Sequence, residues 1–133
     1  MHEGDVYATI GEDGFSRLVS AFYAQVPTDT ILGPMYQQHD LAAAEQRLRD
    51  FLVFRFGGPP RYAQQRGHPR LRARHAPFHI DGAARDRWVS LMDRALDEAA
   101  LPADADAVLR GFFHDTATFL VNRQGLGTGP SSS

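Results

Sequence analysis

The sequence contains no cysteine and no lysine, so all 14 of its basic residues are arginine. The lack of cysteine excludes disulfide bonds and thiol catalysis. No apolar run approaches the roughly 20 residues that a membrane-spanning helix needs. The formal net charge of −2 offers no general attraction to nucleic acid or to anionic lipid. We therefore expect a protein that binds neither nucleic acid nor a membrane.

The chain has 133 residues, of which 43% are hydrophobic and 23% are charged, as is typical of a globular domain. Its first residues, Met-His-Glu-Gly-Asp, are acidic and polar and lack the pattern of a secretory signal, so we expect a cytoplasmic protein. We expect a single domain over residues 1–122. Residues 123–133 have almost nothing to bury, and we expect them to form a disordered tail.

Apolar residues recur three and four positions apart along most of the chain, which is the spacing of one helix face. No segment alternates convincingly with a period of two, so the predicted fold class is all-α. The predicted pieces are a turn or two over 6–10 that stops at Gly11, a helix over 15–26, at most one turn within 31–36, a helix after Asp40 that ends at the Gly57-Gly58-Pro59-Pro60 run, a helix from Asp81-Gly82 to Leu101-Pro102, and a last helix from Asp104 or Asp106.

Two of these helices carry specific expectations about which side chains are buried. In the helix that Asp40 is predicted to cap, the residues expected on the apolar side are Leu41, Ala44, Leu48, Phe51 and Leu52, whereas Glu45, Arg49 and Asp50 are expected elsewhere. The last helix is expected to bury Val108, Leu109, Phe112, Phe113, Phe119 and Leu120.

Residues 67–80 are unusually rich in histidine and arginine and are bounded by two prolines. Pro69 can open a short helix and Pro77 ends it, which places His75 one turn after Leu71 on the same face. A histidine held in this way can offer one ring nitrogen to a metal. A zinc site using His68, His75 and His79 is a weaker alternative, because Pro77 interrupts the helix that would align the last two.

Tyr23, Tyr36 and Trp88 bring polar atoms into otherwise apolar surroundings. Each of them taken alone is more often a core residue than a ligand-binding residue. Buried tyrosine and tryptophan nevertheless need a partner for the O–H or N–H, and a polar ligand inside the core would supply it.

The sequence resembles the truncated haemoglobins, and specifically their group II branch, over residues 6–122. The resemblance depends on Phe-Tyr-Ala-Gln-Val at 22–26, Met-Tyr at 35–36, Asp-Leu-Ala-x-Ala-Glu at 40–45, Gly-Gly-Pro at 57–59, Gly-His-Pro-Arg-Leu-Arg-x-Arg-His-Ala-Pro-Phe at 67–78 and Arg-Asp-x-Trp at 85–88. It departs from the family pattern at Glu12, where a second glycine is common, and at Phe56, where tryptophan is frequent.

The resemblance implies a two-over-two helical sandwich around one haem b, with His75 as the proximal ligand of the iron. It implies polar distal residues at Tyr23, Tyr36 and Trp88, and a small residue, Ala44, where ordinary globins keep a distal histidine. The other residues that it implies around the haem are Leu48, Phe51, Phe78 and Met92 as apolar contacts, and Arg47, Tyr62 and Arg72 as partners of the propionates.

The expected function is binding of dioxygen, nitric oxide or carbon monoxide at a pentacoordinate iron. Donors aimed at bound dioxygen would slow its release, which favours redox chemistry on dioxygen, nitric oxide or peroxide and requires an unidentified electron donor. Nitric oxide dioxygenase or peroxidase-like activity is compatible with this expectation, and a homodimer is left open. The alternatives are an oxygen carrier or store involved in oxygen transport, and a haem-free helical interaction module.

Overall fold

The computed structural model describes residues 1–36, 40–59, 81–119 and 121. Within these ranges all regular secondary structure is helical, as the apolar spacing predicts. A short 3-10 helix, η1, spans Glu3–Asp5. The α-helices that follow are α1 (Val6–Gln25), α2 (Leu32–Tyr36), α3 (Leu41–Arg55), α6 (Gly82–Ala99) and α7 (Ala103–Phe119).

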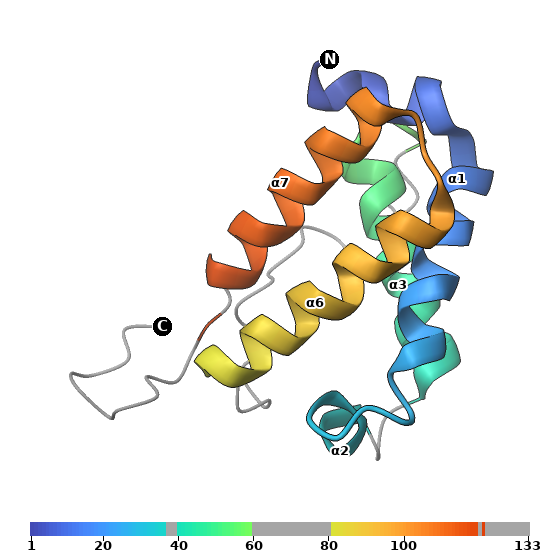
Figure 1. Ribbon diagram of the computed structural model, residues 1–133. Coiled ribbons are helices and arrows are strands. Elements are labelled where there is room, and N and C mark those ends of the chain that lie inside the picture. Colours follow the sequence, from blue (N-terminus) through green and yellow to red (C-terminus); the bar gives the residue numbers. More distant parts are fainter. Residues whose placement is uncertain (37–39, 60–80, 120, 122–133) are drawn as a thin grey trace.

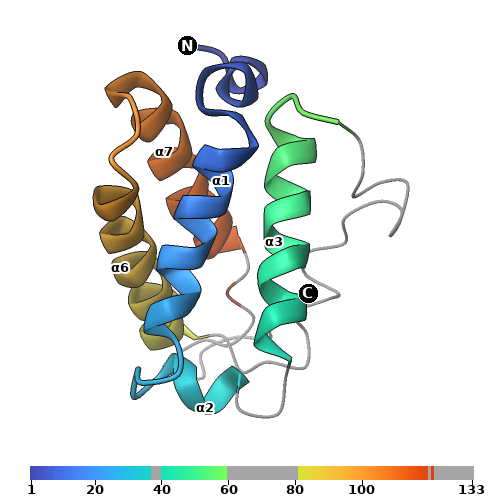
Figure 2. The same ribbon diagram turned by 90° about the vertical axis from the view of Figure 1, so that its right-hand side faces the viewer.

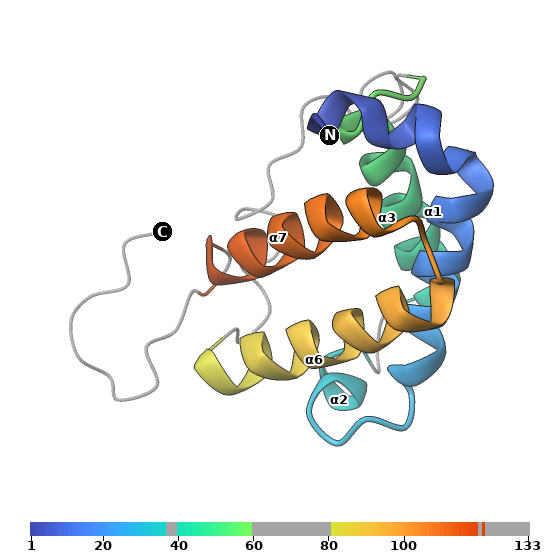
Figure 3. The same ribbon diagram turned by 45° about the horizontal axis from the view of Figure 1, so that its top comes forward.

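The four longer helices form two pairs that cross each other. Helix α1 lies alongside α3 (Figure 2). Helix α6 lies alongside α7 (Figures 1 and 3). Helix α1 also packs against α6, which joins the two layers. Helix α2 sits at one end of the molecule, against α6 (Figure 2). This arrangement is the two-over-two helical sandwich that the sequence predicts.

Glycines set the path of the chain at two points near the N-terminus. Gly11 has φ 67° and ψ −179°, a conformation that other residues rarely adopt, and it kinks α1 between its first turns and the rest of the helix. Gly57 has φ 98°, and a Cβ atom there would lie 2.2 Å from the carbonyl oxygen of Gly4. The end of α3 can therefore approach η1 only because residue 57 has no side chain.

Both predicted aspartate caps are confirmed. The Asp40 carboxylate accepts a hydrogen bond from the Ala43 amide at 3.2 Å, and the Asp81 carboxylate accepts one from the Ala84 amide at 2.9 Å. The predicted start of the last helix was late by one residue or more, because α7 already begins at Ala103.

Two expectations about burial were wrong. Phe119 is 54% exposed, because it lies on the side of α7 that faces an open groove and away from the core. Asp50 was expected on the polar side of α3 but is only 4% exposed. Gln46, one turn earlier, donates a hydrogen bond of 2.9 Å to its carboxylate, which offsets part of the cost of removing the charge from water. Leu120 lies outside the described residues.

A large apolar core lies between the two layers. Phe15, Phe22, Phe56 and Phe113 are essentially inaccessible to solvent, and aromatic contacts continue from them toward α2 and α7. Among the helices that the structure describes, none is long and apolar enough to cross a membrane.

Candidate functional site

The side chains of Tyr23 and Tyr36 meet where α1 approaches α2. Their ring centroids are 6.0 Å apart and the rings are almost perpendicular, at 88°. A hydrogen bond joins their hydroxyls. Burial is the main reason that the pKa of each tyrosine lies above its ordinary value. Both hydroxyls are therefore neutral hydrogen-bonding groups at physiological pH.

Trp88 continues this aromatic group on α6. Its ring lies 5.2 Å from Phe22, and Phe22 in turn packs edge-on against Tyr23 at 5.0 Å. The indole is half-buried. No hydrogen bond joins its N–H to any residue in the described part of the chain, so this donor remains available to a bound molecule. The three polar aromatic side chains predicted from the sequence are thus brought into one cluster by α1, α2 and α6.

Helix α3 contributes apolar residues to the same core. Ala44 and Phe51 are 8% and 7% exposed, and Leu48, which lies between them on the same face, is half-buried. From α6, Met92 lies one turn after Trp88 and is fully buried. The side chain at Ala44 carries no hydrogen-bond donor and little bulk, as predicted.

Arg47 is the one cation on α3 that acts on the tyrosine pair. Its positive charge favours ionisation of both Tyr23 and Tyr36, although burial outweighs this effect. The arginine is half-buried, and among the described residues it forms no ion pair or hydrogen bond. A half-buried guanidinium without a partner is costly, and an anionic group in this position would relieve that cost.

Several predicted site residues fall outside the described ranges. These are His75, the predicted iron ligand, and Tyr62, Arg72 and Phe78, together with His68 and His79 of the zinc alternative. Within residues 1–36, 40–59, 81–119 and 121 no cluster of three or more histidine, aspartate or glutamate side chains could hold a metal ion. The described part of the candidate site therefore consists of the side chains that α1, α2, α3 and α6 contribute.

Sequence reasoning missed one pair of residues next to this site. The carboxylate of Asp29 accepts hydrogen bonds from the amides of Ile31 and Leu32 and from Arg87, the residue before Trp88. A local signal for the cap was present, because an aspartate side chain typically accepts from amides two and three residues further on at the start of a helical turn. The contact with Arg87 spans 58 positions and has no local signal.

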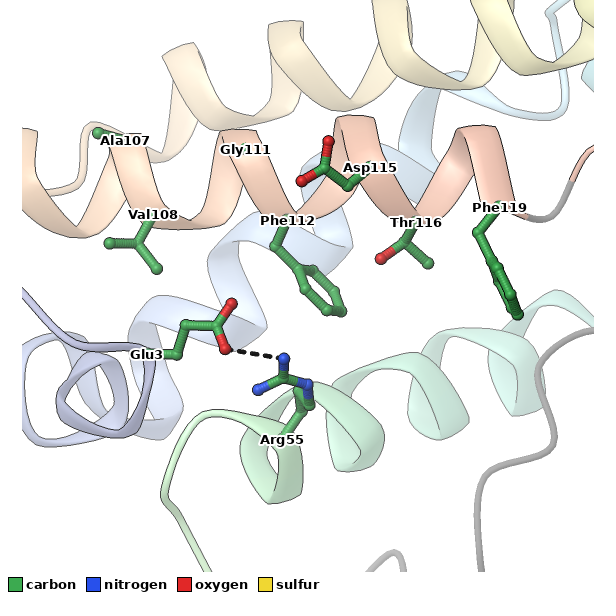
Figure 4. Close-up of a pocket in the computed structure, with 9 residues that line it drawn as sticks. All are labelled: Glu3, Arg55, Ala107, Val108, Gly111, Phe112, Asp115, Thr116 and Phe119. Carbon is green, nitrogen blue, oxygen red and sulfur yellow. Dashed lines mark hydrogen bonds and ion pairs between the residues drawn. The ribbon is translucent and has the colours of Figure 1, made fainter.

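A separate groove of about 600 Å³ opens between α7, the end of α3 and η1. Figure 4 shows Arg55 and Glu3 facing each other across it, 2.8 Å apart, with Phe112 and Phe119 above them on α7. The guanidinium of Arg55 also lies 5.1 Å from the centre of the Phe112 ring. None of the predicted site residues that the structure describes lines this groove.

Comparison with known proteins gives consistent matches. Residues 5–122 match the family model described as bacterial-like globin. The group 2 truncated hemoglobin YjbI of Bacillus subtilis is 38% identical over 117 residues, which are 88% of each chain.

Solved structures agree with these matches. The thermostable hemoglobin from the actinobacterium Thermobifida fusca is 45% identical, with a TM-score of 0.84 over 88% of this chain and 96% of its own. The truncated oxygen-avid haemoglobin from Bacillus subtilis is 38% identical, with a TM-score of 0.83 over 88% of this chain and 98% of its own.

Proposed function

The chain belongs to the bacterial-like globin family and to its group II truncated haemoglobins, and from this premise we propose that it holds one haem b through His75. Membership of the family carries haem-based binding of dioxygen. The haem, when bound, would supply an iron that can take up dioxygen, nitric oxide or carbon monoxide. We propose that Tyr36 and Trp88 are the principal donors to such a ligand and that Tyr23 fixes Tyr36.

The observation that carries this proposal is the gathering of Tyr23, Tyr36 and Trp88 into one aromatic cluster beside the apolar core. Tyr23 is hydrogen-bonded to Tyr36 and would orient its hydroxyl, and a tyrosine hydroxyl can donate to a bound ligand. The indole N–H of Trp88 is a second donor. The ring of Phe22, which contacts both Tyr23 and Trp88, links it to the tyrosine pair. Two donors in an apolar setting stabilise a ligand that carries partial negative charge.

These donors favour slow release of dioxygen. A hydrogen bond to a charged group contributes roughly 1.5–3 kcal/mol, and about 1.4 kcal/mol corresponds to a factor of ten in an equilibrium. Two such bonds would lower the rate of release by roughly 10² to 10⁴ if they were additive, although neighbours in one network often are not. The similar Bacillus subtilis protein is described as oxygen-avid, which supports the same conclusion.

Slow release argues against a role as an oxygen carrier, since a carrier must give up its ligand readily. We propose redox chemistry on dioxygen, nitric oxide or peroxide, such as nitric oxide dioxygenation or a peroxidase-like reaction. Repeated turnover would require an electron donor. Residues Ala44, Phe51 and Trp88 would set the size of the molecule that can enter.

The residues described on α3 fit a haem. Arg47 lacks a protein partner among the described residues, and a propionate group would supply the negative charge that it needs. Leu48, Phe51 and Met92 would form the apolar contacts with the macrocycle, with Phe78 as a further contact. Tyr62 and Arg72 complete the proposed propionate partners.

The direct test is the absorption spectrum of the purified protein and of two histidine variants. The unmodified protein should be red with a strong Soret band, and His75→Ala should lose stable haem uptake. His114→Ala is the matched control, because His114 lies on α7 and is bonded to Asp93 at 3.0 Å, outside the proposed site. Full haem retention with an unchanged spectrum in His75→Ala would show that another residue binds the iron.

A further inference from the structure

One buried carboxylate joins the segment that carries Tyr36 to the helix that carries Trp88. The side chain of Asp29 lies between α1 and α2 and is only 5% exposed. Its Oδ2 atom accepts hydrogen bonds from the amides of Ile31 and Leu32, at 2.9 and 2.8 Å, and its Oδ1 atom accepts one from Nη1 of Arg87, at 2.8 Å. A single group therefore caps α2 and connects it to α6.

Each of the two connected helices carries one of the proposed ligand donors. Helix α2 has only five residues and its last residue is Tyr36, so the position of the Tyr36 side chain follows the position of the whole helix. Arg87 is the residue before Trp88 on α6. Moving the Asp29–Arg87 contact would thus change the distance between the two donors.

Helix α2 is held by contacts with the rest of the molecule, including the burial of its first residue, Leu32, in the core. A helix of five residues is not stable by its own hydrogen bonds. The amide of Gly33 donates to the Asp29 carbonyl at 3.0 Å, and the Gly33 backbone lies close to the carbonyl oxygen of Val26 at the end of α1. Among the described helices α2 packs chiefly on α6. Asp29 is at the centre of these contacts.

The charge state of Asp29 agrees with this geometry. Burial disfavours the ionised carboxylate, but the two backbone amides and Arg87 outweigh that effect and hold the pKa of Asp29 below its ordinary value. The carboxylate is therefore ionised throughout the physiological range and can pair with Arg87 at all times.

We propose that Asp29 and Arg87 are positioning residues that hold Tyr36 and Trp88 at the separation needed to bind one small ligand together. The inference rests on the proposed function, in which those two side chains donate to the ligand. Hydrogen bonds weaken steeply when donor and acceptor are misaligned, so a small displacement of α2 is enough to reduce the retention of the ligand.

The central variant is Arg87→Gln, which removes the charge but leaves the Asp29 cap on α2 intact. Arg87 is 39% exposed, so the substitution should not prevent folding, and an ion pair of this kind adds little to global stability. The matched control is Arg85→Gln on the same helix, because Arg85 bonds to Thr118 of α7 and to Asp86, away from the tyrosines. Arg87→Lys keeps the charge and should restore part of the effect.

The first measurement is the rate of dioxygen dissociation from the haem-loaded ferrous protein. We expect Arg87→Gln to release dioxygen roughly three to ten times faster than the unmodified protein, as expected when donors are displaced without being removed. Arg85→Gln should leave the rate unchanged. In a Tyr36→Phe background, Arg87→Gln should have a much smaller effect, because the donor that it positions is already absent.

The second measurement does not depend on ligand kinetics. Hydrogen exchange of the Ile31 and Leu32 amides, followed by NMR in the haem-loaded protein, should be faster in Arg87→Gln than in Arg85→Gln, because α2 is held less firmly. The melting temperatures of the two variants should be similar.

The outcomes separate the two proposals. If Tyr36→Phe accelerates release while Arg87→Gln and Arg85→Gln behave alike in both measurements, the positioning role is refuted and the donor role stands. If Tyr36→Phe leaves the rate of release unchanged, the donor role itself fails, and the positioning role fails with it.

Discussion

A hydrogen bond joins the hydroxyls of Tyr23 and Tyr36, across rings that lie almost perpendicular to each other. The two tyrosines are the same type of residue, but the proposed function gives them different roles. We propose that Tyr36 donates to the bound ligand and that Tyr23 orients Tyr36.

Replacing each tyrosine by phenylalanine should therefore give unequal effects. Tyr36→Phe removes a donor to the ligand and should accelerate dioxygen release by roughly 10- to 100-fold, the equivalent of one hydrogen bond to a charged group. Tyr23→Phe removes only the support of Tyr36 and should accelerate release by less. Stopped-flow dissociation rates of the ferrous proteins will decide, and a larger effect for Tyr23→Phe would show that Tyr23 is the principal donor to the ligand.

Trp88 should act as the second donor. Trp88→Phe keeps an aromatic ring beside Phe22 and Phe113 but removes the N–H, so it isolates the hydrogen bond from the packing. We expect faster dioxygen release, and a stronger acceleration still when Tyr36→Phe is added. An unchanged rate in this double variant would contradict the donor role of both residues.

Ala44 should govern entry of the ligand. Its side chain is small and buried on the face of α3 that also carries Leu48. Ala44→Phe should slow ligand association, by about tenfold for each 1.4 kcal/mol added to the barrier. Ala42→Phe is the matched control, because Ala42 is exposed on the same helix. Flash photolysis of the carbon monoxide complex measures the rate, and faster association in Ala44→Phe would rule out a gate at this residue.

Replacing each of two glycines by alanine should change the free energy of unfolding in opposite directions. Gly57→Ala places a side chain 2.2 Å from the Gly4 carbonyl oxygen at a positive φ, and should reduce the free energy of unfolding by about 1–3 kcal/mol or more. Gly111→Ala, in the middle of α7 with no atom within 4 Å of the new Cβ, should raise it by about 0.5–1 kcal/mol. Urea denaturation of the two variants tests this, and equal shifts would contradict it.

The stability contributed by Asp29 should depend on pH. Its pKa is lower in the folded protein than the ordinary value of 3.8, since Arg87 and two amides outweigh the effect of burial. A lowered pKa adds stability that is present above pH 3.8 and is lost as the pH falls through the folded value. The difference in unfolding free energy between the unmodified protein and Asp29→Asn should therefore be largest near neutrality and shrink in acid. A difference that is constant down to the acid limit would contradict the ion pair.

The positions of the helices could be predicted from the sequence because their signals are local. The three-four spacing of apolar residues gave the helices, and Asp40 and Asp81 act as caps through amides only three residues away. Tyr23, Tyr36 and Trp88 were found in the same way, as polar atoms placed on apolar faces. His75 was identified from its proline-bounded setting and the resemblance, and its role remains a prediction.

Only the tertiary structure decided which faces are covered and which distant residues meet. Spacing places Phe119 on an apolar face, but it cannot tell that this face of α7 borders an open groove. Asp50 is buried and Arg87 pairs with Asp29 because of how whole helices pack, and contacts across 58 positions leave no periodic trace in the chain. The sequence by itself thus determined the helices and the residue types available to the site, whereas helix packing determined which of those side chains meet.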